Sequence, residues 1–263
     1  MNTGTILAVL SFVTAAGNLA TYHPKMISNH ATLRPRREQI VMVLALALAI
    51  AGFVLQPGVV GYAIGGIAIV PAFLFLLATA TSGLPAQKLA VAVGTPAPDF
   101  SLMDADGRPF RLSELRGSPV LLKFYRGYWC PYCVAELAQL DRFAKDFAAL
   151  GVKLVGVSSD RVDELAPFAR KHKWSIALLA DPLLVAHQLY NVQYRKFAAR
   201  RGPFRDLAIP TTILIDRDGR VLWLDQSPDF RVRPQADMVL AKTTALLPGG
   251  EAQAAASCDI CAA

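Results

Sequence analysis

The feature that most constrains this chain is the absence of charge from two long stretches of its N-terminal third. No charged side chain occurs from Met1 to Tyr22, and none occurs from Gln39 to Gln87. Because about 20 apolar residues cross the hydrocarbon core of a bilayer, the second stretch is too long for one span. The turn-forming sequence Gln56-Pro57-Gly58 divides it. We therefore predict a transmembrane region over residues 1–83, with spans at residues 3–22, 40–56 and 59–81.

The first of these segments also fits a second interpretation, that of a cleaved signal peptide. Thr14, Gly17 and Asn18 make it the weakest of the three as a membrane span. A signal peptide, however, begins with basic residues, and no Lys or Arg precedes this apolar run. We therefore expect a retained helix. If it is not a span, the remaining stretch forms a two-helix membrane region.

Basic residues predict the orientation of these helices. The loop between the first two spans carries Lys25, Arg34, Arg36 and Arg37, whereas the turn at Pro57-Gly58 is uncharged. Cytoplasmic loops are enriched in Lys and Arg, so the chain after Thr81 is expected in the cytoplasm, at the inner or plasma membrane. The same loops explain the formal net charge of +7. The basic residues form no stripe interleaved with aromatic residues, so we expect no nucleic-acid partner.

A pair of cysteines indicates the chemistry of the remaining chain. The sequence Trp129-Cys130-Pro131-Tyr132-Cys133 lies between an apolar run and a helical pattern, so a strand ends and a helix begins there. The free N–H groups and the dipole of a helix start favour a thiolate. Residues three apart share a helix face and can close a disulfide. We predict a redox site in which Cys130, with a lowered pKa, is the nucleophile and Cys133 resolves, without cofactor or metal. A metal-binding pair is the alternative.

Alternating patterns predict an α/β domain over residues 93–247, after a linker at residues 84–92. Strands are expected at residues 119–125, 152–158, 176–179, 211–215 and 221–224, the last two joined by a hairpin turn. Helices are expected at residues 131–150, 160–172, 183–190 and 234–247, with Asp160 as a cap. A basic, irregular segment at residues 194–206 is expected to be an exposed insertion. This order predicts a mixed central sheet flanked by helices.

Three segments resemble known redox proteins. Residues 94–117 resemble the opening of the redoxin group, which includes peroxiredoxins and membrane-tethered thioredoxin-like reductases. The motif Trp129–Cys133 is similar to a thioredoxin or glutaredoxin active site. Ile209-Pro210-Thr211 resembles the cis-proline loop that faces the cysteines in that fold. The resemblance implies a thioredoxin-like fold, in which a cis Pro210 places the Ile209 backbone beside the sulfurs to pair with a substrate strand.

Two departures bear on the reaction. Peroxiredoxins place Thr or Ser three residues before the attacking cysteine, where this chain has Gly127, and Pro210 stands in place of their peroxide-polarising arginine. Conversely, Tyr125-Arg126-Gly127 resembles a peroxiredoxin-like branch described as antioxidant, and Arg126 could supply the missing cation. We predict a membrane-anchored thiol–disulfide oxidoreductase that acts on a disulfide-bearing protein with a thiol reductant. The alternatives are a peroxiredoxin-like thiol peroxidase and a non-catalytic membrane protein that binds metal.

The sequence also suggests surroundings for a tryptophan and a lysine near the motif and for the histidines. Trp129 is expected to shield the disulfide and contact partners, with simple packing as the alternative. Lys123 is expected to be solvated at the surface. The histidines are scattered and are expected in loops or at the surface: His23, His30, His172 and His187.

A second cysteine pair lies in the C-terminal tail. Residues 248–263 are rich in small residues and include Cys258 and Cys261. We expect a flexible segment, which would extend about 33 Å from Pro248 to Cys258 if fully stretched. We predict that this dithiol exchanges electrons with the Cys130–Cys133 pair. A metal-binding tail and an incidental pair are the alternatives.

Overall fold

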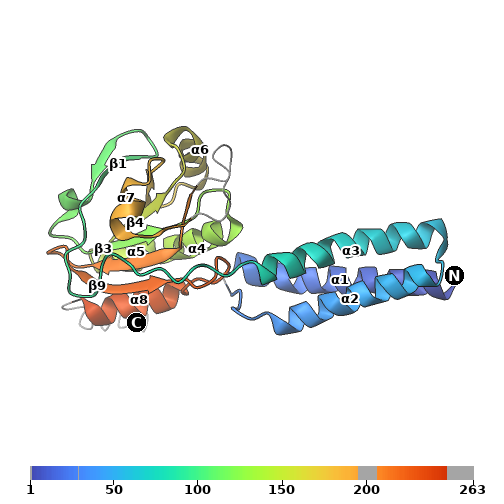
Figure 1. Ribbon diagram of the computed structural model, residues 1–263. Coiled ribbons are helices and arrows are strands. Elements are labelled where there is room, and N and C mark those ends of the chain that lie inside the picture. The colour runs from blue at the N-terminus through green and yellow to red at the C-terminus, as the bar shows by residue number, and fades with distance from the viewer. Residues whose placement is uncertain (1, 29, 195–205, 248–263) are drawn as a thin grey trace, which may run out of the picture. The chain divides into compact units, whose positions relative to one another are not determined.

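The computed structural model describes residues 2–28, 30–194 and 206–247, and the chain forms two compact units, Met1–Gly83 and Leu84–Ala263 (Figure 1). The first unit consists of α1 (Thr3–Ile27), α2 (Arg36–Val54) and α3 (Gly58–Ala80). All three helices are long and apolar enough to cross a membrane, as the sequence predicted. Helix α1 continues beyond the predicted end at residue 22 and includes Pro24.

Small residues, together with Tyr22, Met42 and Phe75, lie between these helices, and many large apolar residues point outward. A Cβ atom added at Gly4 would lie 2.8 Å from the carbonyl oxygen of Gly52, so these two backbones approach closely. The Ser11 hydroxyl donates to the carbonyl of Ala45 at 2.7 Å. The outer surface instead exposes large side chains such as Ile40, Val59, Val60 and Ile67. Small residues and interhelical hydrogen bonds inside, with apolar residues outside, are typical of helices packed within lipid.

The second unit contains one seven-stranded sheet with the order β2-β1-β5-β4-β3-β8-β9. The strands are β1 (Ser101–Asp104), β2 (Pro109–Arg111), β3 (Val120–Phe124), β4 (Lys153–Ser158), β5 (Ala177–Ala180), β8 (Thr211–Ile215) and β9 (Val221–Gln226). Strands β3, β4 and β5 are parallel, and the others pair antiparallel. The predicted mixed sheet and its final hairpin are therefore confirmed. A separate two-stranded sheet joins β6 (Gln193–Tyr194) to β7 (Leu207–Ala208).

Helices cover both faces of the large sheet. They are α4 (Pro131–Arg142), α5 (Ala144–Ala149), α6 (Val162–His172), α7 (Val185–Tyr190) and α8 (Ala236–Leu246), with the 3-10 turn η1 (Leu112–Leu115) before β3. The predicted helix over residues 131–150 is wrong in one respect, because it breaks at Phe143 into α4 and α5. Asp160 does not cap α6, which begins at Val162 after Arg161.

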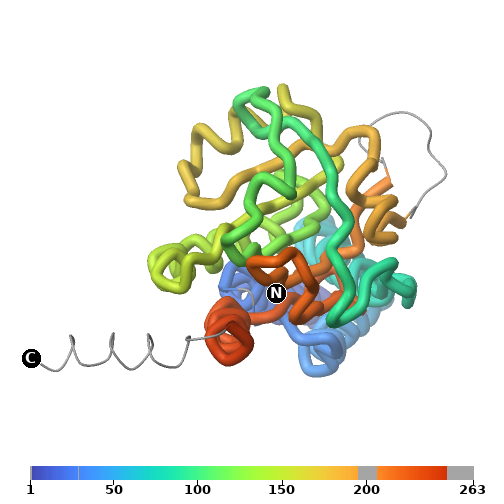
Figure 2. The backbone as a smooth tube through the Cα atoms, turned by 90° about the vertical axis from the view of Figure 1, so that its left-hand side faces the viewer, coloured from blue at the N-terminus to red at the C-terminus, as the bar shows by residue number. Residues whose placement is uncertain are grey.

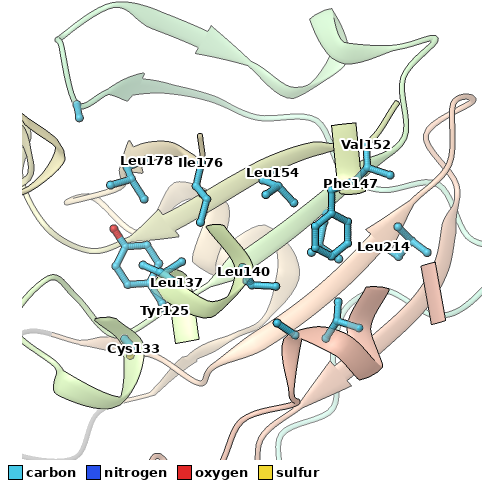
Figure 3. Packing of buried hydrophobic residues seen from close by; sticks show 14 of the residues in the cluster. Tyr125, Cys133, Leu137, Leu140, Phe147, Val152, Leu154, Ile176, Leu178 and Leu214 are labelled. Atoms are coloured by element: carbon cyan, nitrogen blue, oxygen red, sulfur yellow. The ribbon is translucent and has the colours of Figure 1, made fainter. Parts of the chain in front are cut away.

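The central strand β3 contributes to two hydrophobic cores because alternate side chains point to opposite faces. Leu121 and Tyr125 belong to the core beneath α4, α6 and α8, shown in Figure 3. Leu122 and Phe124 belong to the other core, which α7 covers. Both faces of β3 are thus buried, and the loop that follows this strand starts from the rigid centre of the sheet.

An extended segment precedes β1 and crosses the second unit (Figure 2). Its backbone N–H groups at Gly94 and Ala97 donate to Val221 and Gly219, near the β8–β9 turn. Earlier in the segment, the N–H of Ala90 donates to the carbonyl of Tyr190 at the end of α7. These bonds attach residues 90–97 to the sheet domain.

The prediction that all histidines lie in loops or at the surface is wrong for His187. This residue lies in α7 with no exposed surface, and its Nδ1 is 2.7 Å from Asp181 Oδ2. Asp181 also accepts the backbone N–H groups of Val185 and His187. The pair stabilises the start of α7 beneath the ring of Phe124.

Candidate active site

The two predicted cysteines lie where β3 meets α4. Cys130 occupies the position before the first helical residue, and Pro131 begins α4. The carbonyl of Cys130 accepts the N–H groups of Cys133 and Val134, each at 3.0 Å. Both cysteines are present as free thiols and both are fully buried. The strand-to-helix position predicted for the pair is therefore confirmed, but neither sulfur is exposed.

The loop before Cys130 depends on a glycine. Gly127 has φ +149°, a backbone conformation that side chains disfavour. A Cβ atom there would overlap Trp129 Nε1 and lie 2.9 Å from Asp160 Oδ1. Asp160 Oδ2 accepts the backbone N–H of Tyr128 at 2.9 Å and the hydroxyl of Ser158 at 2.8 Å. Burial raises the pKa of Asp160 to about 6. The carboxyl thus secures the loop that carries the cysteine.

Cys133 has the stronger set of hydrogen-bond donors. Arg233 Nη2 lies 3.5 Å from its sulfur, and the backbone N–H of Arg126 also bonds to it. Although burial opposes ionisation, the hydrogen bond from Cys130 and the charge of Arg233 lower the pKa of the Cys133 thiol well below its usual range. In the reduced pair these donors favour the negative charge on Cys133 over Cys130. The helix start alone does not decide which sulfur ionises first.

Cys130 has one cation nearby, at a longer distance. Arg126 Nη1 lies 3.9 Å from its sulfur. The hydrogen bond to Cys133, burial and the charge of Cys133 raise the pKa of the Cys130 thiol well above its usual value, against the opposing effect of Arg126 and Arg233. The lowered pKa predicted for Cys130 is thus contradicted in this conformation, because the two sulfurs share one proton and Arg233 favours the charge on Cys133.

Aromatic side chains surround Arg126. Its guanidinium carbon lies 4.4 Å from the ring centre of Phe230 and 5.2 Å from that of Trp129. Tyr132, from the first turn of α4, packs edge-on against Phe230 at 6.0 Å. Trp129 is 46% exposed. The tryptophan therefore packs on the cation beside Cys130 and still presents a large apolar surface to solvent.

A buried chain of charges continues from Cys133 into the protein. Arg233 Nε lies 3.0 Å from Glu136 Oε2, and Lys123 Nζ lies 2.5 Å from Glu136 Oε1. Lys123 also donates to Thr212 Oγ1 at 2.9 Å. Lys123 is 1% exposed, so the prediction that it is solvated is wrong. Burial lowers the pKa of Lys123 and raises that of Glu136, and in each case the opposite charge counteracts the effect.

Sequence reasoning missed Glu136 and Arg233. Glu136 lies three residues after Cys133 and is buried in α4, as are Leu137 and Leu140. An acid within an apolar stripe is a signal that could have been recognised. Arg233 is 100 residues away from Cys133, and no local pattern connects the two.

The loop at Ile209 and Pro210 differs from the predicted cis-proline loop. The peptide bond between them is trans. The Ile209 N–H donates to Val192 at 2.6 Å, and its carbonyl accepts the hydroxyl of Thr211. The carbonyl of Pro210 accepts the N–H of Ser227. Both residues are buried. Because these bonds occupy the Ile209 backbone, it is not free to pair with a substrate strand in this conformation.

Two further expectations concern metal and the tail. Within residues 2–28, 30–194 and 206–247, no three His, Cys, Asp or Glu side chains are grouped as metal ligands. The proposed second dithiol, Cys258 and Cys261, lies outside the described residues, as does most of the predicted insertion at residues 194–206.

Sequence comparison relates the second unit to two kinds of thiol protein. Residues 93–224 match the AhpC/TSA family. A putative peroxiredoxin of Mycobacterium tuberculosis is 35% identical over 160 residues, covering 59% of this chain and 98% of that protein. The thiol-disulfide oxidoreductase ResA of Geobacillus thermodenitrificans is 32% identical over 136 residues, covering 51% of this chain and 70% of ResA.

Solved structures agree with the architecture. The crystal structure of peroxidoxin BcpB from Mycobacterium tuberculosis has a TM-score of 0.50 and 31% sequence identity, and the match covers 60% of this chain and 99% of BcpB. A PrxQ mutant from Xylella fastidiosa has a TM-score of 0.52 at 20% identity, covering 59% and 96%. The thioredoxin-like α/β fold predicted for the second unit is thereby confirmed.

Proposed function

Because this chain belongs to the AhpC/TSA family and is an oxidoreductase, we propose that it is a membrane-anchored thiol–disulfide oxidoreductase whose redox centre is the Cys130–Cys133 pair. The observation that carries the proposal is the pairing of two buried thiols on the first turn of α4, each with an arginine against its sulfur. A dithiol that shares one proton between hydrogen-bonded sulfurs is suited to two-electron exchange with a disulfide.

The first step of the proposed reaction is attack by Cys130. Its chain neighbours Trp129 and Pro131 are exposed, whereas the neighbours of Cys133, Tyr132 and Val134, are half-buried. Transfer of the shared proton from Cys130 to Cys133 leaves a Cys130 thiolate beside Arg126. That thiolate attacks one sulfur of the substrate disulfide, and the other substrate sulfur leaves as a thiolate. A mixed disulfide between Cys130 and the substrate results.

The second step is resolution by Cys133. The Cys133 thiol transfers its proton to the substrate thiolate released in the first step and attacks Cys130 Sγ, which breaks the mixed disulfide and releases the second substrate thiolate. The substrate disulfide gains two electrons and the enzyme pair becomes a disulfide. A thiol reductant then restores the dithiol by the reverse exchange. Because both sulfurs are buried, the substrate has to displace Arg126 beside Cys130 or the Trp129 and Phe230 rings that pack on Arg126.

A thiol peroxidase is the second candidate, favoured by the relative of 98% coverage that is named a putative peroxiredoxin. In that reaction a thiolate attacks a peroxide and becomes a sulfenic acid while an alcohol or water leaves, and the other cysteine then forms the disulfide and releases water. Two arginines near the sulfurs could stabilise the departing oxygen. Gly127 offers no hydroxyl to the site.

Membrane attachment of the enzyme is supported by the first unit. Its three helices are long and apolar enough to span a bilayer, and their large apolar side chains point outward. Lys25 in the last turn of α1, Arg34 in the loop, and Arg36 and Arg37 at the start of α2 support a cytoplasmic loop there. With three spans, the Cys130–Cys133 pair is then expected in the cytoplasm as well. Single cysteines at positions 32 and 57, in a chain whose natural cysteines are serine, test this orientation in intact cells with a thiol reagent that does not cross the membrane. We expect labelling at position 57 and not at position 32. Labelling at position 32 alone would contradict the orientation.

Purified full-length protein in detergent distinguishes the two activities. We expect it to reduce insulin disulfides in the presence of a dithiol reductant, and we expect substitution of either Cys130 or Cys133 by serine to abolish turnover. Peroxide consumption is measured on the same preparations. Rapid peroxide turnover without disulfide reduction would contradict the proposed function and support the peroxidase.

A further inference from the structure

The reaction proposed above leaves one buried group without a role, the ion chain that ends at Cys133. It consists of Lys123, Glu136 and Arg233, which are respectively 1%, 2% and 4% exposed. Glu136 contacts both cations, at 2.5 Å and 3.0 Å, and Arg233 reaches the Cys133 sulfur at 3.5 Å. The three residues come from β3, α4 and the loop before α8.

The charges of this chain do not balance without the sulfur. Lys123 and Arg233 contribute two positive charges and Glu136 contributes one negative charge. Burial of a net charge is costly because the surroundings cannot solvate it as water does. A thiolate at Cys133 supplies a second negative charge beside Arg233, which a thiol or a disulfide does not, while Asp225 acts as a further negative charge on Lys123 at the other end of the chain. The cluster is therefore best matched to the reduced, ionised state of Cys133.

Other ionisable groups also surround Cys133. The groups with an electrostatic effect on it, besides Arg233 and Glu136, are Cys130, Arg126, Tyr125, Asp160 and Tyr194. Asp160 is held by the Tyr128 N–H and Ser158 at the loop before Cys130. Arg233 is the guanidinium bonded to the Cys133 sulfur, and Glu136 holds it from the other side.

We propose that Arg233 is a positioning residue that holds the resolving Cys133 as a thiolate, with Glu136 and Lys123 fixing the guanidinium in place. This inference rests on the proposed function, since it assigns a role within the resolving step. When Cys130 is engaged in a mixed disulfide, Arg233 promotes loss of the proton from Cys133, and the resulting thiolate attacks Cys130 Sγ and displaces the substrate thiolate. Arg233 also favours the dithiol over the disulfide state, which makes the pair more oxidising.

The direct test isolates the Cys133 thiol. In full-length protein with Cys130, Cys258 and Cys261 changed to serine, Cys133 is the sole thiol. Its ionisation is followed by thiolate absorbance near 240 nm as the pH is raised. We expect Arg233→Met to raise the apparent pKa by at least about one unit, because an opposite charge within about 4–6 Å typically lowers a pKa by 1–3 units. Arg233→Lys is expected to restore part of the shift.

Matched variants separate charge from folding. Arg231→Met removes another buried arginine of the same loop, one that pairs with Asp229, and is expected to leave the Cys133 titration unchanged. Arg233→Gln keeps a polar side chain without charge and replaces Arg233→Met if that variant does not fold. An unchanged Cys133 titration in a folded Arg233→Met or Arg233→Gln variant would overturn the proposal. So would an equal shift in Arg231→Met.

A second measurement uses the intact pair. Equilibration with glutathione is measured in the variant that retains Cys130 and Cys133 and lacks Cys258 and Cys261. We expect Arg233→Met to disfavour the dithiol by about tenfold, or about 30 mV; no change would contradict the proposal. Insulin reduction is assayed alongside. An Arg233-dependent titration in a protein that reduces no disulfide would refute the proposed function and leave the role of Arg233 intact.

Discussion

Replacement of Glu136 by glutamine is the most informative perturbation of the site. The substitution keeps the shape of the side chain but removes a negative charge that contacts both Lys123 and Arg233. Two buried cations then lose the carboxylate between them, although Asp225 still acts on Lys123 and the Cys133 sulfur still lies beside Arg233. Loss of one partner from a buried ion pair typically costs about 3–5 kcal/mol. Since a change of 1 kcal/mol shifts the melting temperature of a domain this size by about 2–4 °C, we expect a decrease on the order of 10 °C.

The contacts of Glu136 predict which single variant loses more stability. Lys123→Met leaves Glu136 still paired with Arg233, so it is expected to destabilise less than Glu136→Gln. Combining the two substitutions is expected to recover part of the loss, with a coupling energy above about 1 kcal/mol, because contacting residues are not independent. Glu114→Gln, at an exposed position, serves as the control and is expected to change stability by less than about 0.5 kcal/mol.

Tryptophan fluorescence offers a selective assay for this comparison. The three tryptophans, Trp129, Trp174 and Trp223, all lie in the second unit. Thermal or urea unfolding of the full-length protein in detergent is thus followed without a signal from α1–α3. If Glu136→Gln costs less than about 1 kcal/mol, or if Lys123→Met does not recover any of the loss, the charge argument is refuted.

Three further perturbations concern the loop and its cation. Gly127→Ala places a Cβ against Trp129 and Asp160 at φ +149°; we expect a loss of about 1–3 kcal/mol, measured by the same unfolding assay. Asp160→Asn removes a carboxyl whose pKa is raised to about 6. Since the folded state retains this proton to higher pH, Asp160 makes stability fall as the pH rises from about 4 to 6, and Asp160→Asn is expected to abolish that slope. Arg126→Met removes the cation 3.9 Å from Cys130 and is expected to slow mixed-disulfide formation about tenfold in single-turnover mixing.

Each of these expectations has a contrary result and a control. Gly107→Ala, in the second unit at φ +80°, meets no atom within 4 Å and is expected to cost less than Gly127→Ala; a Gly127→Ala protein as stable as the parent would show that the loop adapts. A stability slope that persists between pH 4 and 6 in Asp160→Asn would assign the slope to other groups. Mixed-disulfide formation at the parent rate in Arg126→Met would exclude its charge from the attack.

The sequence predicted those parts of the structure that depend on neighbouring residues. Uncharged stretches predicted α1–α3, since membrane-spanning length and apolarity are local properties. The position of Cys130 at a helix start followed from the apolar run before it and the helical pattern after it. The final hairpin followed from its turn sequence. In each case the pattern and the three-dimensional element span the same few residues.

The errors concern properties that distant residues decide. Lys123 was expected at the surface although it stands within an otherwise apolar strand buried on both faces. Its partner Glu136 and the next member, Arg233, come from other elements, so the ion chain has no single sequence pattern. Distant residues also decide the conformation of the Ile209–Pro210 peptide bond. The free energies of the cis and trans forms before proline differ by only about 0.5–1 kcal/mol, so tertiary contacts select between them.

The same distinction applies to the pKa values of the cysteines. A helix start predicted a lowered pKa at Cys130. The structure adds Arg233 at 3.5 Å and the Arg126 N–H to Cys133, which outweigh the effect of the helix start and direct the charge to the second sulfur. The position of the redox pair was thus predictable from the sequence, whereas the distribution of charge within it was not.

In the proposed reaction Cys130 is the sulfur that meets the substrate. In full-length protein lacking Cys258 and Cys261, we expect Cys133→Ser to accumulate a mixed disulfide with a protein substrate through Cys130, detected by mass spectrometry. We expect Cys130→Ser to trap none, and the parent to form an internal Cys130–Cys133 disulfide with release of two substrate thiols. Trapping through Cys133 in the Cys130→Ser variant, with none through Cys130 in Cys133→Ser, would contradict the account.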